Sequence, residues 1–223
     1  MKLKRIGAVV TLAVATGLIL SSCSLLPSVG GNEGDDKPGK GTSAPSKPSD
    51  EGTDDEGTGS DAPSETIAAP GSKVGLNEWL SYDYTGVDDV KAVIAARLVS
   101  VTPATDAQAE TIIEAIPDAA GYDFVFFKVE QKKVSGADIA FNADYTAFNP
   151  VSANGERVQD VTLIGWDECK SVSFTEEFDK GETITQCVVG AYKDGSAMPA
   201  GVNYSEFDTA YDYYDGKPLL FIK

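Results

Sequence analysis

Hydrophobic and polar residues divide this chain into three segments. Residues 6–20 form an uncharged run of mostly Ala, Val, Leu, Ile and Gly. Residues 24–72 are dominated by Gly, Ser, Pro, Asp, Glu, Thr and Lys, with few large apolar side chains. Residues 73–223 alternate between apolar and polar positions with regular periods, which is the pattern of a folded domain.

Several runs in the third segment have the two-residue period of β-strands. Residues 122–129 (YDFVFFKV) are apolar at both alternating sets of positions, which predicts a central strand covered on both faces, with Lys128 at the rim. Trp79, Tyr82 and Tyr84 are expected to lie in a strand or lead-in that packs on the core, with an aromatic surface patch as the alternative. Further strands are predicted at residues 90–101, 138–148, 158–164, 183–192, 202–207 and 219–222.

One helix is predicted, from Thr105 to Ile116. Thr105 can cap it, Gln108 stands three residues later as in a capping box, and Pro117 ends it. Turn signals at Ser135-Gly136, Asn154-Gly155 and Gly181 separate the strands. Many short strands with such turns and one short helix predict a mainly β protein, folded as an antiparallel β-sandwich.

The first segment has the order of features of an export signal. A basic start (KLKR) precedes the uncharged run, whose 15 residues are too few to span a bilayer. The following LSSC, which ends at Cys23, resembles the lipobox of bacterial lipoprotein signal peptides, in which a diacylglyceryl group joins the Cys sulfur. The resemblance implies that residues 1–22 are a signal peptide and that Cys23 carries a lipid anchor. An uncleaved anchor and an ordinary secretory signal are the alternatives.

The second segment is predicted to be a disordered linker over residues 23–72. Its few apolar side chains cannot offset the entropy lost on ordering. We expect it to tether a domain of residues 73–223 to the extracytoplasmic face of the cell membrane. The alternative is a tail with a binding partner of its own.

Charge excludes some classes of partner. The domain holds 25 Asp and Glu against 12 Lys and Arg, a net charge of −13. Nucleic acid and nucleotide are not expected, because phosphate binding needs a basic surface. Repulsion also disfavours direct contact with anionic lipid, so the predicted attachment to the membrane is through the lipid alone.

The chain has three cysteines. Once Cys23 is assigned to the lipid, Cys169 and Cys187 remain, and an exported protein is expected to join them in a disulfide.

The order of these motifs resembles a known family. An aromatic strand at residues 122–129, Ser135-Gly136, Asn154-Gly155, a Phe-x-x-Gly-Glu turn and a strand containing Val188-Val189 follow one another along the chain. This order is similar to that of the telokin-like, immunoglobulin-like domains of secreted proteins of Gram-positive bacteria, which include an immunoprotective mycobacterial antigen. The resemblance covers about residues 88–223. It implies an immunoglobulin-like sandwich and no enzymatic activity. The predicted helix and the cysteine pair depart from the family, and the pair is expected to tie the loop around Cys169 to the strand that holds Cys187.

No combination of residues in the chain predicts catalysis or a cofactor. The absence of His removes the usual general base and metal ligand. The residues most typical of a site are Asp208, Asp212 and Asp215, which lie among tyrosines and could form a weak calcium or ligand site. Their spacing departs from the EF-hand pattern, and a solvated turn is the alternative.

These observations lead to two functional hypotheses. The first is a surface lipoprotein whose non-catalytic immunoglobulin-like module contacts an envelope protein or glycan. The second is a ligand- or calcium-binding accessory lipoprotein, for instance a partner of a transporter.

Overall fold

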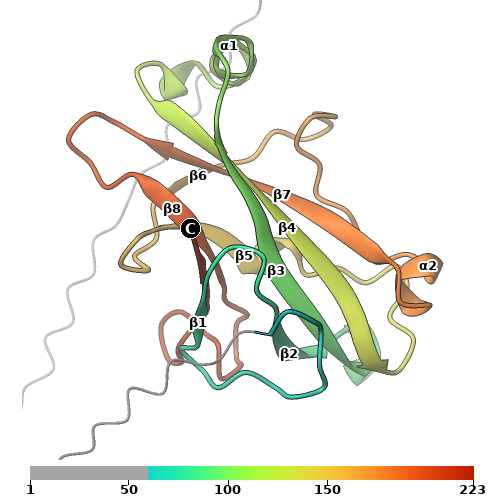
Figure 1. Ribbon diagram of the computed structural model, residues 1–223. Helices are drawn as coiled ribbons and strands as arrows, with labels where there is room; N and C mark the ends of the chain where they lie inside the picture. Colours follow the sequence, from blue (N-terminus) through green and yellow to red (C-terminus); the bar gives the residue numbers. More distant parts are fainter. Residues whose placement is uncertain (1–59) are drawn as a thin grey trace, which may run out of the picture. The chain divides into compact units, whose positions relative to one another are not determined.

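A computed structural model describes residues 60–223 of the chain. The predicted signal peptide, Cys23 and the linker up to residue 59 lie outside the described residues. The described part folds as two β-sheets packed face to face, so the predicted mainly β sandwich is confirmed (Figure 1).

Strand pairing in the two sheets is antiparallel except between β1 and β9, which run parallel. The five-stranded sheet has the order β2 (Leu80–Thr85), β3 (Lys91–Pro103), β4 (Asp123–Gly136), β7 (Thr183–Tyr192) and β6 (Gln159–Val161). The four-stranded sheet has the order β1 (Lys73–Val74), β9 (Leu219–Ile222), β8 (Pro199–Tyr204) and β5 (Phe148–Ser152). The helical segments are α1 (Asp106–Ala115), α2 (Glu176–Asp179) and the short 3-10 turns η1 (Val87–Asp89), η2 (Pro117–Ala119) and η3 (Tyr145–Ala147).

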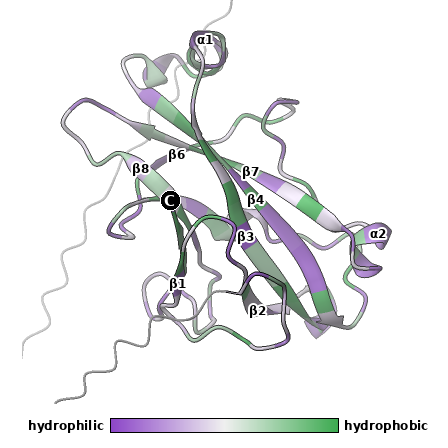
Figure 2. Ribbon diagram, in the orientation of Figure 1, coloured by the Kyte–Doolittle hydropathy of each residue, from purple (hydrophilic) through white to green (hydrophobic). Residues whose placement is uncertain are grey.

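The main core lies between the two sheets, and β4 is central as predicted. Val125, Phe127 and Val129 point into this core, while Phe124 and Phe126 point to the outer face. Helix α1 and the segment around Trp166 cover that outer face and form a second, smaller core. The C-terminal half of β4 is more hydrophilic than its N-terminal half (Figure 2). Two of its polar side chains, Gln131 and Lys133, are buried in the interior.

Local sequence signals account for several elements directly. Helix α1 has the predicted capping box: the Gln108 N–H donates to Thr105 Oγ1, and the Thr105 N–H donates to Gln108 Oε1. Such a cap stabilises a helix by about 1 kcal/mol. Strands β7 and β9 have the predicted bounds. Tyr82 and Tyr84 lie in β2 and are buried in the core, and Trp79 immediately before it is also buried.

The strand predicted at residues 138–148 is wrong. This stretch is a loop that ends in η3, and β5 begins only at Phe148. The Asp179 carboxylate accepts the N–H groups of Ile139 and Ala140, which removes them from any strand ladder. Phe141, which falls within the predicted strand, is 80% exposed at a positive φ of 68°.

Two other predicted strands extend too far. Strand β6 ends at Val161 rather than residue 164, and Ile164 is fully exposed, because the chain turns away from the sheet towards the disulfide. Strand β8 ends at Tyr204, and Phe207 is 83% exposed in the following loop.

The predicted boundary between linker and domain at residue 72 is too late. Residues 60–72 lie beside β2, where the Trp79 N–H donates to the Ser60 carbonyl and the Ala68 N–H donates to the Ser81 carbonyl. Ile67 packs against the main core, which offsets part of the entropy lost in ordering this polar segment. The segment also shields the edge of β2, which would otherwise be open to other chains.

Candidate functional site

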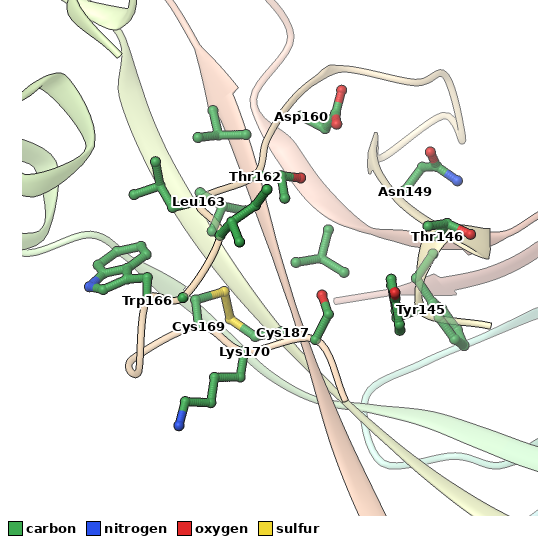
Figure 3. A pocket seen from close by; sticks show the side chains of 17 residues that line it. Tyr145, Thr146, Asn149, Asp160, Thr162, Leu163, Trp166, Cys169, Lys170 and Cys187 are labelled. Carbon is green, nitrogen blue, oxygen red and sulfur yellow. A yellow bond between two sulfur atoms is a disulfide. The ribbon is translucent and has the colours of Figure 1, made fainter. Parts of the chain in front are cut away.

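A cleft of about 670 Å³ opens at the edge of the sandwich, between edge strand β5 of one sheet and edge strand β6 of the other. Figure 3 shows its side chains on either side of β7, which crosses the view between them. One wall follows η3 and β5, and the other follows residues 160–171. Its polar, charged and aromatic lining residues include Tyr145, Thr146, Asn149, Asp160, Trp166 and Lys170.

The wall at residues 160–171 exists because the chain leaves β6 early. Gly165 has a positive φ of 77°, a conformation that favours glycine, and it turns the chain outward. The Trp166 ring then packs edge-on against Phe126, with ring centroids 5.5 Å apart. The predicted disulfide joins Cys169 to Cys187 with the two Cα atoms 5.0 Å apart, so it fixes this loop to β7.

The same segment passes around the edge of β7. A disulfide joins Cys169 to Cys187, whose side chain belongs to the outer core. Three residues later, the backbone of Val172 is hydrogen-bonded to the buried side chain of Gln186, the residue of β7 that precedes Cys187. Strand β6 pairs with β7 only at residues 189–191. The crossing loop therefore covers part of the edge that β6 leaves unpaired, which protects it from joining other strands.

The opposite wall, formed by η3 and β5, is fixed by a backbone hydrogen bond and by a buried aromatic contact. The Ala147 N–H donates to the Asp144 carbonyl at 2.8 Å and closes the turn of η3. Phe148 is buried against Tyr204 on β8, with ring centroids 5.4 Å apart. Tyr145 lies between these two anchored positions and keeps 38% of its surface exposed to the cleft side of the molecule.

A buried hydrogen-bonded cluster connects the two walls beneath the cleft. The Tyr82 hydroxyl donates to Asp144 Oδ2 at 2.6 Å, and Gln131 Nε2 donates to both Asp144 oxygens at 2.8 and 3.0 Å. Gln186 Nε2 donates to Gln131 Oε1 at 3.0 Å and to the Val172 carbonyl at 2.8 Å. The cluster thus runs from Asp144, next to Tyr145, to Val172, next to Ser171.

Burial dominates the electrostatics of this cluster. Removal from water raises the pKa of Asp144 from 3.8 to about 6, although the hydrogen bonds from Tyr82 and Gln131 act in the opposite direction. Burial also raises the pKa of Tyr82 and of Tyr204, whose rings stack with centroids 3.9 Å apart. Asp144 is therefore an acid that changes charge close to neutral pH.

The cleft itself carries short polar groups and balanced charge. Asp160 and Lys170 are the charged residues among its lining side chains, and the Lys170 ammonium pairs with Asp167 at 2.6 Å on the exposed rim. Hydrogen bonding from Lys170 lowers the pKa of the Asp167 carboxyl. Threonine and serine hydroxyls, the Asn149 amide and the Tyr145 hydroxyl add further polar groups. The rest of the lining is mainly apolar and includes Phe148, Val161, Leu163, Ile164, Trp166, Val188 and Val189.

The predicted aspartate cluster does not form a cation site in this geometry. Asp212 is buried, and its carboxylate accepts the N–H groups of Asp208, Tyr214 and Asp215. The N–H groups of Tyr214 and Asp215 are the main cause that lowers the pKa of Asp212. Its oxygens are occupied in closing a turn, and among residues 60–223 no group of three or more His, Cys, Asp or Glu side chains is arranged to hold a metal ion.

Sequence reasoning missed most of this site. The cysteine pair was predicted, and it lies in the outer core together with Trp166. Asp144, Tyr145 and Asn149 carried no signal, because the first two fall within a wrongly predicted strand.

Among the described residues, no helix is long and apolar enough to cross a membrane.

The fold and cleft define a two-sheet β-sandwich with an edge cleft. Comparison with known proteins adds little to that description: no protein-family model matches the chain, and no curated protein does. Among solved structures, the chain is similar to MPT63, a secreted protein from Mycobacterium tuberculosis, with a TM-score of 0.44 and 14% identity. The match covers 72% of this chain and 100% of that one. At this level of similarity we take no ligand, partner or activity from MPT63.

Proposed function

We propose that this chain is a non-catalytic binding module, anchored through Cys23 to the outer face of a bacterial membrane, whose edge cleft holds a neutral segment of envelope glycan. The observation that carries the proposal is the cleft, whose volume of about 670 Å³ is that of a small-molecule site. The disulfide supports an oxidising compartment. The lipobox pattern supports the anchor.

The lining favours a glycan over other ligands. Sugars present hydroxyl groups at their rim and apolar C–H groups on their ring faces. The hydroxyls, the Asn149 amide and the Asp160 carboxylate can exchange hydrogen bonds with the rim, while the Tyr145 ring can contact a face. One acidic and one basic lining residue leave the cleft neutral within a strongly acidic domain, which favours an uncharged ligand.

Titration with neutral trisaccharides tests the proposal. Chitotriose, cellotriose, maltotriose and mannotriose are each added to the purified chain, and binding is followed by calorimetry and by intrinsic tryptophan fluorescence. We expect at least one to bind, and Tyr145→Ala to weaken that binding about tenfold through loss of the ring contact. Tyr214→Ala is the matched control, because Tyr214 is 81% exposed outside the cleft and its loss should leave the affinity unchanged.

The proposal is overturned if none of the four sugars binds, or if both tyrosine variants bind equally to the unaltered chain. Calcium is a separate arm of the same calorimetry. The occupied oxygens of Asp212 lead us to expect a flat calcium trace, which would set aside the calcium-binding form of the second hypothesis.

A further inference from the structure

The two walls of the cleft differ in polarity. Thr146 and Asn149 place a hydroxyl and an amide on the wall formed by η3 and β5. The opposite wall contains a short apolar segment, in which Leu163 and Ile164 stand just before Gly165 and Trp166. Figure 3 shows Thr146 and Asn149 on one side of β7 and Leu163 and Trp166 on the other. A ligand that matches both walls therefore needs a polar part and an apolar part.

The strands between the walls extend the apolar side. Val188 of β7 packs against the main core, and Val161 of β6 packs against the outer core. Both side chains line the cleft and remain partly exposed there. The apolar side of the cleft is thus built from two strands and the loop that follows β6, and it is larger than a single sugar face requires.

Ile164 is the side chain in this apolar segment that packs on neither core. Leu163 and Trp166 pack against the outer core, whereas Ile164 is fully exposed. A single exposed apolar residue is common on protein surfaces. This one, however, lines a cleft beside other apolar residues, on a loop that the disulfide fixes to β7. It is therefore held ready to bury apolar surface when an apolar group enters the cleft.

Charge disfavours an anionic amphiphile in the cleft. The domain carries a net charge of −13. Lys170 is the one cation among the described lining residues, and its ammonium already pairs with Asp167 at 2.6 Å. A phosphate or carboxylate headgroup would therefore enter a negative field without a free cation to receive it. A neutral headgroup such as a sugar meets no such penalty.

We propose that the ligand of the cleft is a neutral glycolipid. Its sugar contacts the wall formed by η3 and β5, and its alkyl chain lies along the apolar segment at Ile164. This inference rests on the proposed function, which supplies the sugar part of the ligand. The alkyl chain adds affinity by removing CH₂ groups from water, while the polar wall orients the headgroup.

Matched alkyl glycosides test the proposal. The methyl and octyl glycosides of glucose, N-acetylglucosamine and mannose are titrated into the full chain below their micelle concentrations, with calorimetry as the measurement. We expect at least one octyl glycoside to bind about tenfold more tightly than its methyl counterpart, a gain that burial of about two CH₂ groups supplies. Tetraethylene glycol octyl ether, which has the same chain and no sugar, should bind more weakly than that octyl glycoside.

Ile164→Ser identifies the contact with the alkyl chain. Because Ile164 is fully exposed, the variant should fold, and it should lose most of the difference in affinity between the octyl and methyl glycosides. Val87→Ser is the matched control, since Val87 is also β-branched, is 72% exposed and lies outside the cleft. This control should keep the difference. A difference that is unchanged in Ile164→Ser overturns the proposal.

Methyl signals in the NMR spectrum locate the bound alkyl chain. A second, smaller apolar cavity of about 340 Å³, lined in part by Val101, Pro103 and Met198, offers the chain an alternative place. On a ¹³C-labelled protein, we expect the octyl glycoside to shift the δ-methyl signal of Ile164 and to leave the ε-methyl signal of Met198 unchanged. A larger change at Met198 would place the alkyl chain in the second cavity and contradict the proposal.

The two proposals can fail separately. If the trisaccharides bind but each octyl glycoside binds no more tightly than its methyl counterpart, the cleft is a glycan site and the lipid part of the ligand is wrong. If no trisaccharide binds and the sugar-free octyl ether binds as tightly as the octyl glycosides, the glycan assignment itself is wrong.

Discussion

The environment of Asp144 differs strongly from that of an ordinary surface carboxylate, because this side chain is buried. Its pKa is raised from 3.8 to about 6 by burial, so the folded state binds a proton more readily than the unfolded chain does. The free energy of unfolding must therefore rise as the pH falls through this range. The total gain is about 1.4 kcal/mol for each unit by which the pKa is shifted. Protonation of Asp144 is therefore expected to stabilise the folded domain.

Asp144→Asn gives a direct measure of that effect. We expect the unfolding free energy of the unaltered chain, relative to the variant, to increase by about 2.5 kcal/mol between about pH 7.5 and about pH 4. Urea titrations of both proteins at each pH supply the difference, which cancels the general relief of charge repulsion in this acidic domain. A difference that is constant with pH, or that falls on acidification, would contradict the account of Asp144.

The failures of sequence reasoning at single residues have a common cause. Thr105 and Gln108 signal their capping box because their partners lie within one helical turn. Ile139 was assigned to a strand because its neighbours alternate, but its N–H is bound by Asp179, 40 residues away in the sequence. Asp144 likewise meets Tyr82 and Gln131 only in the folded chain, so its role could not be predicted from its position.

At the scale of elements, the loop of residues 162–172 decides the shape of the cleft. It leaves the sheet after β6, crosses the edge of β7 and is fixed by the disulfide on one side and by Gln186 on the other. The sequence predicted the disulfide from the compartment and the number of cysteines, and it predicted the strand β7 with the bounds that the structure has. It could not predict the cleft, whose walls come from segments that the chain brings together only through the two sheets.

Removing both cysteines measures how much the loop contributes. We expect Cys169→Ala with Cys187→Ala to lower the unfolding free energy by about 3 kcal/mol. The two cysteines are 18 residues apart, and without the disulfide the unfolded chain gains the entropy of the opened loop. Urea unfolding under oxidising conditions checks the value. Ser171→Ala, in the same loop but outside the disulfide, is the control and should change stability little. An unchanged midpoint for the double variant would show that the loop is held by its other contacts.

At the scale of the whole molecule, the mainly β sandwich could be predicted from strand periods and turn residues. The start of the domain could not be predicted in this way. Residues 60–72 are mostly polar and show no strand period, and they are ordered by backbone hydrogen bonds to Trp79 and to Ser81 of β2. The proposed anchor and the strong negative charge fit together physically. Lipid chains hold a protein at the membrane without help from its surface, so the domain is free to be acidic.

Cys23→Ala tests the anchor. We expect the unaltered chain, expressed in a bacterium with lipoprotein processing, to sediment with membranes and to release into the soluble fraction when this cysteine is replaced. Cys187→Ala is the matched cysteine control and should stay with the membranes. Membrane association that survives Cys23→Ala would refute lipid attachment at this residue.

The central claim is that the edge cleft binds a glycan. Its most direct test is to map which backbone amides change their NMR shifts when a sugar binds. Backbone amide shifts are recorded as the best-binding trisaccharide is added at neutral pH. The account predicts that the largest changes fall within residues 145–149, 160–171 and 187–189, the segments that contain the residues lining the cleft. Changes confined to the Asp208–Asp215 loop, or spread evenly over the domain, would contradict the assignment of the cleft as the binding site.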